Sequence, residues 1–401
     1  MLARHLASRG HDVVWWTSAF DHTQKAHLAT ENAEIQWEGV TLRLVRALGY
    51  KRNVSLARVI DHALVAHRFE RLANSAVPPD IILASMPTID LAQAATRVGE
   101  RFAIPAVIDI RDLWPDVYLE LVPSFVRFAA SIAIKLPRRQ VRNTCRRAYA
   151  ITGNAPNFVE WGLKLAERPP GRFDRFFPFG YSVPEVSESR RAAAREYWRS
   201  HGLTRGHDDL IGCYLGAIGH QSDFETVIEA ARLLAGSAVK FRMIFCGTGD
   251  RLDGLREQAR DIPEVVFAGW VEQPEILELM AIAQFGIAPY WNHSGYIGNL
   301  PNKPIEYLAG GLPVVTCLSG FLKDFITSHE CGFWYQAQDP MGLVRLVRDL
   351  DENREKLERA SVNARRVFDA SFDAPVVYSA MVDYLEDIVR HTSKQRPEGS
   401  H

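Results

Sequence analysis

The feature that most constrains the fold of this chain is a series of short apolar segments, each followed by a turn and then by a helical pattern. Four of them lie in the second half: LIGCYLGAIG (210–219), FRMIFCGTG (241–249), VVFAGWV (265–271) and FGIAPY (285–290). Helical patterns separate them, over 223–235, 251–260 and 274–283. Strands that alternate with helices predict a parallel sheet with helices on both faces. We therefore expect a Rossmann-like domain of the α/β class.

The first half follows the same rule. Strand patterns cover 13–17, 80–85 and 106–110, and helical patterns lie before Gly10, near 89–101 and up to Arg147. A doubly wound sheet begins with a strand, whereas this chain begins with a helix. We expect that the first strand of the sheet and the glycine turn after it are missing from the sequence.

The domain boundaries follow from the rhythm of strands and helices. Residues 168–190 interrupt it with a segment rich in Pro, Gly and charge. We expect an N-terminal domain over 1–180, a linker over 181–207, a C-terminal domain over 208–370, and a helix over 371–392 that packs back towards the N-terminal domain. The two doubly wound domains would face each other across a cleft, into which the carboxyl ends of both sheets open.

Composition argues against several classes of protein. The formal net charge is −1, which gives no support for bulk binding of nucleic acid. The five cysteines show neither CxxC nor Cys/His metal spacing, which favours a reducing compartment and hence the cytoplasm. No apolar run is long enough to span a bilayer.

Four motifs of the second half resemble, in order and spacing, the donor domain of family 4 glycosyltransferases of the GT-B fold. They are LGAIGHQSDFETVIEAARLL (215–234), FCGTGDRLDGLREQA (245–259), VVFAGWVEQPEILELMAIAQFGIAPY (265–290) and LPNKPIEYLAGGLPVV (300–315). In the first half, RGHDVVWWTSAFDH (9–22) and DIRDLWPDVYLEL (109–121) are similar to the bacterial N-acetyl-L-fucosamine transferase subgroup, which acts on lipid-linked acceptors. The resemblance implies a nucleotide-sugar substrate, with UDP as the expected nucleotide.

Lys303 and Glu306 are the principal candidates for donor binding. Asn302 is expected to cap a helix, Pro304 fits its first turn, and the positive end of the helix dipole favours an anion there. Lys303 adds a full charge for the diphosphate, which gains negative charge as the glycosyl bond breaks, so it is also a catalytic candidate. Glu306 can accept both hydroxyls of a ribose and matches the second Glu of the family motif Glu-x7-Glu. The simpler alternative is that neither residue has a function: a Glu in the first turn complements the helix dipole, and a Lys there is often only solvated.

The chain departs from the family pattern at the position of the first Glu, which is Gly298. Backbone amides of Gly298, Asn299 and Leu300 are expected to bind sugar hydroxyls instead. Relatives carry Arg and Lys on the first glycine turn, where this chain has Ala217 and Ser222. The remaining donor-binding candidates lie on the glycine turns and the strand end after them: Gly216, Gly219, Gly247, Gly249, Arg251 and Trp270. Tight turns, and a core or rim Trp, are the structural alternatives.

Three residues of the first half are candidates for catalysis. Asp112 follows a strand and is expected to accept or relay the proton of the acceptor hydroxyl, with Arg111 fixing it or touching phosphate. A purely structural Arg/Asp pair is the alternative. His22 is the other polar candidate. The resemblance implies retention of configuration by a front-face route in which the departing diphosphate helps to deprotonate the acceptor, without metal or other cofactor.

A basic segment lies at 121–150. No Asp or Glu occurs from Leu121 to Val159, whereas the segment carries Arg127, Lys135, Arg138, Arg139, Arg142, Arg146 and Arg147. Interleaved apolar residues suit the interface of an anionic membrane, where a polyprenyl diphosphate acceptor would lie. A solvated helix, or one that pairs with acids elsewhere, is the alternative. We expect no nucleic-acid partner, since no recognition motif accompanies the segment.

The sequence thus predicts a retaining, metal-independent hexosyltransferase-type enzyme of surface polysaccharide synthesis, peripheral on the inner face of the cell membrane. A UDP-sugar 2-epimerase of the same fold is the alternative enzyme. A degenerate nucleotide-sugar binding protein is the alternative from another class, suggested by Gly298, Ala217 and Ser222.

Overall fold

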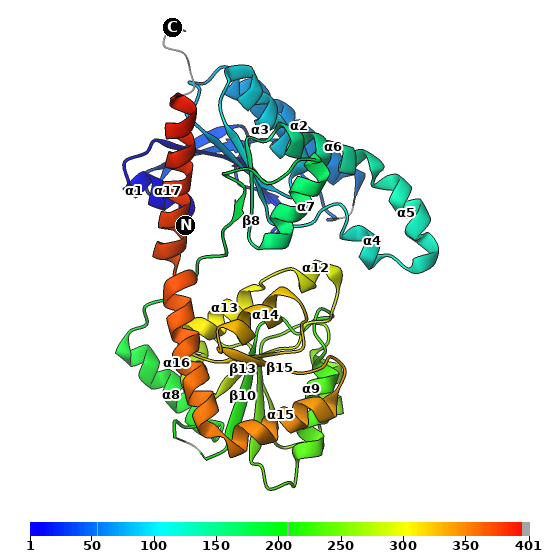
Figure 1. Ribbon diagram of the computed structural model, residues 1–401, viewed down its shortest axis with the longest axis vertical. Helices are drawn as coiled ribbons and strands as arrows, with labels where there is room; N and C mark the ends of the chain where they lie inside the picture. The colour runs from blue at the N-terminus through cyan, green and yellow to red at the C-terminus, as the bar shows by residue number, and fades with distance from the viewer. Residues whose placement is uncertain (54, 207, 395–401) are drawn as a thin grey trace. The chain divides into compact units, whose positions relative to one another are not determined.

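The computed structural model describes residues 1–53, 55–206 and 208–394, and the chain forms two compact units (Figure 1). Unit 1 is Met1–Pro178 together with the chain from Val377 onward, and unit 2 is Phe179–Val376. Each unit has its own parallel sheet and its own core.

Unit 2 holds a six-stranded parallel sheet of order β12-β11-β10-β13-β14-β15. Its strands are β10 (Leu210–Leu215), β11 (Phe241–Cys246), β12 (Val265–Gly269), β13 (Phe285–Ala288), β14 (Val314–Thr316) and β15 (Gly332–Trp334). Because β10 lies between β11 and β13, the direction of strand succession reverses at β10. This doubly wound order confirms the Rossmann-like topology expected from the sequence, and such reversal points are where ligands bind in open α/β sheets.

Helices cover both faces of this sheet. They are α8 (Glu188–Ser200), α9 (Phe224–Leu234), α10 (Leu252–Gln258), α11 (Gln273–Ile282), α12 (Ser294–Ile297), α13 (Asn302–Ala309), α14 (Phe321–Ser328), α15 (Pro340–Glu352) and α16 (Arg354–Ser371). Strand β10 shows the alternation: Cys213 and Leu215 enter the core formed with α11, α13 and α16, whereas Leu210 and Tyr214 enter the core formed with α9 and α15. Successive side chains of a strand point to opposite faces, so one buried strand supplies both cores.

Unit 1 contains two larger sheets and a two-stranded ribbon. The sheets have the orders β1-β5-β4 and β6-β7-β8-β9, and β2 pairs with β3. The strands are β1 (Val13–Ser18), β2 (Phe20–Asp21), β3 (Ala26–His27), β4 (Ala33–Trp37), β5 (Val40–Val45), β6 (Ile82–Met86), β7 (Ala106–Ile110), β8 (Ala150–Gly153) and β9 (Arg175–Phe176). Trp16 of β1 and Ile82 of β6 pack against the same apolar cluster, although within the described residues each strand is the last of its sheet.

The helices of unit 1 are α1 (Leu2–Ser8), α2 (Leu56–Ala73), α3 (Ile89–Phe102), α4 (Tyr118–Leu121), the 3-10 helix η1 (Ser124–Val126), α5 (Arg127–Ala133), α6 (Lys135–Arg147), α7 (Pro156–Ala166) and most of α17 (Ala374–Ser393). The single long helix expected up to Arg147 is therefore divided into shorter helices. Met381, Tyr384 and Ile388 of α17 pack on Val107 and Ala150 of the sheet.

The boundaries differ from the expected linker over 181–207. This stretch belongs to unit 2 and contains α8, whose Trp198 is fully buried and donates its indole N–H to the carbonyl of Glu275 at 2.8 Å. The charged residues of α8 lie on its exposed side, so a composition rich in charge concealed a helix with one buried aromatic anchor. The unit boundary lies instead between Pro178 and Phe179.

Replacing Gly286 by alanine should lower the free energy of unfolding by about 1–3 kcal/mol, because overpacking a filled core costs that much. A Cβ at Gly286 would lie 2.4 Å from Cγ of Tyr307. Chemical denaturation measures the effect. Gly254→Ala in α10 is the matched control, since a Cβ there meets nothing within 4 Å and alanine favours a helix. Equal unfolding midpoints for Gly286→Ala and the wild type would contradict the packing described.

Candidate functional site

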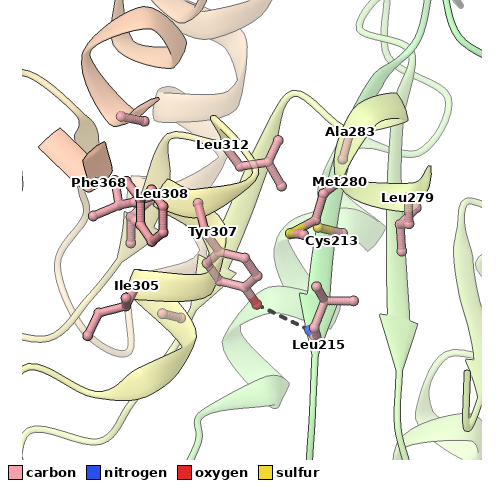
Figure 2. Close-up of a cluster of buried hydrophobic side chains, with 14 of the residues drawn as sticks. Cys213, Leu215, Leu279, Met280, Ala283, Ile305, Tyr307, Leu308, Leu312 and Phe368 are labelled. Carbon is pink, nitrogen blue, oxygen red and sulfur yellow. Dashed lines mark hydrogen bonds between the residues drawn. The ribbon is translucent and has the colours of Figure 1, made fainter. Parts of the chain in front are cut away.

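Helix α13 is fixed above the carboxyl ends of β10 and β13 by one fully buried side chain, Tyr307. Its hydroxyl accepts from the amide of Leu215 at 3.1 Å (Figure 2). It also donates to the carbonyl of Ile287 at 3.1 Å. Gly286 leaves the space that the ring fills. Sequence reasoning missed Tyr307, although a glycine inside a buried strand signals the close approach of another group. The first turn of α13 is thereby held at the reversal point of the sheet.

Lys303 extends from that first turn to the end of β10. Its Nζ lies 5.4 Å from the ring centroid of Tyr214, and a Cβ on Gly216 would lie 2.5 Å from its Cε. Gly216 has a φ of +131°, which other residues rarely adopt. The lysine side chain therefore passes over Gly216 at the carboxyl end of β10.

Glu306 lies one turn further along α13 and is half-buried, like Lys303. Burial raises the pKa of the Glu306 carboxyl and lowers that of the Lys303 ammonium, while the charge of each opposes the shift of the other. Neither side chain forms an ion pair within 4 Å in the described part of the chain. Burial, and then the charge of Glu306, raise the pKa of Tyr181, while a hydrogen bond with Gln273 lowers it. Two partly dehydrated, unpaired charges on one helical turn suit a ligand with its own charge and hydroxyls.

The start of α13 differs from the sequence prediction in one detail. Asn302 was expected to be the N-cap, but it is the first helical residue, and Pro301 precedes the helix with extended backbone and no capping side chain. Helix N-termini leave their first amides without intrahelical acceptors. The amides of Asn302 and Lys303 are the first of these, and the binding of an anion by them stays a prediction.

The two glycine turns pack against each other. Gly216 donates its amide to the carbonyl of Cys246 at 2.9 Å, and Gly247 donates to Gly269 at 2.6 Å. A Cβ on Gly247 would lie 1.9 Å from the carbonyl oxygen of Gly216, and one on Gly249 would lie 2.1 Å from that of Ile218. The structure thus explains these glycines by close backbone approach, and their amides at 216 and 247 are already used.

Amides for a phosphate are left at other positions of the first turn. Ile218 donates to Thr248 at 2.9 Å. Within the described residues, the amides of Ala217 and Gly219 have no protein acceptor. Of the four amides expected to bind phosphate over 216–219, those of Gly216 and Ile218 are therefore already used. Of the two glycines predicted on this turn, Gly216 and Gly219, only Gly219 keeps its amide available.

Arg251 and Trp270 have different surroundings. The guanidinium of Arg251 forms an ion pair with Glu225 and lies 3.4 Å from Nδ1 of His220. Its charge is therefore partly neutralised by the protein. Trp270 follows β12 and is 76% exposed, so it is a rim residue and not a core residue. Exposure leaves its ring free to stack, and its role stays a prediction.

Residues 298–300 form a short connection between α12 and α13. Gly298 is the C-cap of α12 and Asn299 donates its amide to Tyr296 at 2.9 Å. Leu300 is 3% exposed and its side chain belongs to the core. Contact of this connection with a sugar stays a prediction, in which Leu300 can take part only through its backbone.

In unit 1, Arg111 pairs with Asp109 and not with Asp112, which corrects the expected pair. Its Nε lies 2.6 Å from Oδ2 of Asp109, whose carboxylate also accepts from Ser85 at 3.3 Å and Thr152 at 3.0 Å. Residues two apart on an extended segment share a side, whereas neighbours do not. The signal that sequence reasoning missed is a single acid, 3% exposed, inside the apolar strand AVIDI.

Asp112 is half-buried, and burial raises the pKa of its carboxyl while a hydrogen bond from the Leu113 amide lowers it. A raised pKa suits a group that takes up a proton. His22 is exposed in the turn between β2 and β3. The proton-transfer roles of both residues stay predictions.

The described part of the chain offers neither a candidate metal site nor an exposed cysteine. It holds no group of three or more His, Cys, Asp or Glu side chains placed to bind a metal ion. All five cysteines are free and buried, and burial raises the pKa of the Cys145 thiol to about 12. Among the described helices, none has the length and apolar character that a bilayer-crossing segment needs.

Both halves of the sequence match glycosyltransferase families. Residues 1–172 match the model of the glycosyl transferase 4-like domain, and residues 201–367 match that of the glycosyl transferases group 1. The chain belongs to the group 1 glycosyltransferases. Glycogen synthase of Mycobacterium tuberculosis is 24% identical over 208 residues, 50% of this chain and 48% of that protein. Alpha-monoglucosyldiacylglycerol synthase of Streptococcus pneumoniae is 23% identical over 227 residues, 53% of this chain and 50% of that protein. This glycosyltransferase chain spans about half the length of these curated relatives.

Solved structures agree on the fold. Sucrose-phosphate synthase of Thermosynechococcus elongatus has a TM-score of 0.68 at 16% identity, covering 97% of this chain and 92% of that one. HepE of Anabaena in complex with UDP-glucose has a TM-score of 0.59 at 13% identity, covering 87% and 86%. These neighbours have the GT-B fold, which confirms the predicted class of two Rossmann-like domains.

Proposed function

We propose that this group 1 glycosyltransferase moves a sugar from a UDP-sugar to a saccharide carried on polyprenyl diphosphate. The observation that carries the proposal is the position of Lys303 on the first turn of α13 and of Glu306 one turn further along, both without an ion pair among the described residues, at the reversal point of the unit 2 sheet. The UDP-glucose complex of HepE, a neighbour of the same fold, supports UDP as the nucleotide.

The chemistry asked of these residues is electrostatic. Lys303, the amides of Ala217 and Gly219, and the first amides of α13 would hold the diphosphate. As the glycosyl bond breaks, negative charge grows on that group, so fixed positive charge lowers the barrier. Glu306 would accept the ribose hydroxyls. Asp112 of unit 1 is the proposed proton acceptor, and retention without a metal or other cofactor remains part of the proposal.

The acceptor and its location are proposed on other grounds. The named product of alpha-monoglucosyldiacylglycerol synthase is a glycolipid, which supports a lipid-borne acceptor. We propose surface polysaccharide synthesis at the inner face of the cell membrane, with the N-acetyl-L-fucosamine transferases as the related subgroup. The basic segment favours this location over the epimerase alternative, which needs no membrane.

Donor turnover tests the enzyme proposal. Incubation with UDP-sugars and a membrane extract should release UDP, and the release should depend on the extract. Interconversion of UDP-sugars without extract would support the epimerase, and binding without either reaction would support a binding protein. Thermal shift tests the nucleotide separately: stabilisation by GDP but not by UDP would overturn the choice of UDP.

Affinity for UDP-glucose should be highest in a pH window that is narrower than ordinary Glu and Lys pKa values would give. Burial raises the pKa of Glu306, so the carboxylate is lost, as pH falls, earlier than for an exposed glutamate. Burial lowers the pKa of Lys303, so the ammonium is lost earlier as pH rises. Calorimetric titration across pH measures both limbs. Glu306→Gln should remove the acidic limb and Lys303→Met the basic one; unchanged limbs would assign the titration to other groups.

A further inference from the structure

A stripe of large apolar side chains is exposed along the helices that follow α4. Phe125 is 85% exposed, Phe128 79%, Ile132 49% and Leu136 72%. They lie on η1, α5 and the start of α6, at intervals of three and four residues, which places them on one face of the helical path. We call these four residues the apolar stripe. Soluble surfaces rarely leave such a row uncovered without a partner for it.

Helix α6 is anchored in unit 1 through its second half. The opposite side of α6 buries Val141, Thr144 and Cys145 in unit 1. Helix α5 packs mainly against α4, η1 and α6, and it projects from the margin of unit 1 (Figure 1). Helix α5 itself contains no buried residue, so the apolar stripe lies on the part of the segment that packs least on unit 1.

The charges around the stripe divide into two groups. Arg138, Arg142, Arg146 and Arg147 form ion pairs with Asp116, Glu167 and Glu100. Within the described residues, Arg127, Lys135 and Arg139 form none, and all three are exposed. In the second half of the basic segment over 121–150, most cations therefore pair with acids of unit 1, which is the alternative to a membrane surface given above. The unpaired cations lie beside the apolar stripe.

We propose that the apolar stripe inserts into the interface of an anionic lipid bilayer, with Arg127, Lys135 and Arg139 against the headgroups. The inference deepens the membrane location proposed above and needs nothing from the donor site. Apolar burial and attraction to anionic lipid add in such segments. A second copy of the chain is a poorer occupant, because a two-fold contact through the stripe would bring the same three cations of both copies together.

Vesicle flotation of the full chain tests the proposal. The wild type should float with vesicles of phosphatidylglycerol and phosphatidylethanolamine, and part of this binding should survive about 1 M salt, since insertion is not screened. Phe125→Ser with Phe128→Ser should lower partitioning by about 100-fold, roughly tenfold for each phenylalanine. Val77→Ser, at a residue of unit 1 that is 91% exposed, is the matched control and should change nothing.

A second pair of variants separates charge from insertion. Lys135→Gln with Arg139→Gln should weaken binding to anionic vesicles by about 30-fold. Phe128→Cys, labelled with an environment-sensitive fluorophore, should report an apolar surrounding on vesicles, and the buried native cysteines should not compete for the label. UDP affinity of every variant should match the wild type, so a failure of the donor site would be seen separately.

Any one of three results would overturn the inference. These are a wild type that does not float with the vesicles, a double serine variant that floats as well as the wild type, and a fluorophore that still reports an aqueous surrounding on vesicles. Loss of self-association in the serine variant without vesicle binding would assign the stripe to a second copy instead.

Discussion

Replacing Lys303 by methionine should lower kcat/KM for sugar transfer by about 100-fold or more. Methionine keeps an apolar stem over Gly216 and Tyr214 but removes the charge that the departing diphosphate requires. Loss of a hydrogen bond to a charged group costs about 1.5–3 kcal/mol in binding, and loss of a preorganised donor to developing charge costs a similar amount again in the transition state. Both kcat and UDP affinity should therefore fall.

The experiment is steady-state kinetics with calorimetric titration of UDP. Lys240→Ala is the matched control, since this lysine is exposed in the same unit and precedes β11. Lys303→Arg keeps the charge and should recover only part of the activity, because the planar guanidinium is larger than the ammonium that fits over Gly216. Wild-type affinity for UDP in Lys303→Met would remove Lys303 from the diphosphate site.

Replacing Glu306 by alanine should abolish most donor affinity, by about 10- to 100-fold. The carboxylate is the group proposed to accept both ribose hydroxyls, and two charge-assisted hydrogen bonds are lost at once. A comparison of UDP with 2′,3′-dideoxy-UDP isolates this contact. The wild type should bind UDP more tightly than the dideoxy nucleotide, and Glu306→Ala should bind the two equally.

This pairwise design separates a ribose contact from a general loss of structure, because a distorted site would weaken both nucleotides and keep their difference. Glu358→Gln on α16 is the matched control, since Glu358 is an exposed acid of the same unit. A wild-type preference for UDP in Glu306→Ala would mean that another group holds the ribose.

Much of the fold followed from patterns that act locally. Four of the six parallel strands of unit 2, β10 to β13, lie at or near the expected segments, and α3, α9, α10 and α11 begin and end within a few residues of their predicted bounds. The exceptions share one cause: the predicted linker hides Trp198 of α8, and the long helix before Arg147 is divided. Both features depend on the elements of the fold that pack against the segment, and the sequence of the segment alone does not contain this information.

The candidate site shows the same division between local and distant information. Lys303 and Glu306 share a helical turn, so their spacing alone placed them together. The partner of Arg111 could not be found in this way, because Asp109 is held by Ser85 of β6 and Thr152 of β8, which lie far away in the sequence. The glycine turns resembled phosphate-binding loops, but the pairing of β11 with β10 and β12 uses the amides of Gly216 and Gly247.

The sequence by itself determined the alternation of strands and helices, the family, and the lysine and glutamate of α13, since each is carried by residues close together in the chain. Only the tertiary structure decided that Tyr307 locks this helix over Gly286, that four arginines of the basic segment are neutralised, and that an apolar stripe beside the remaining cations is left uncovered. Those facts depend on contacts between residues far apart in the chain, and such contacts exist only once the sheet order and the packing of helices have brought them together.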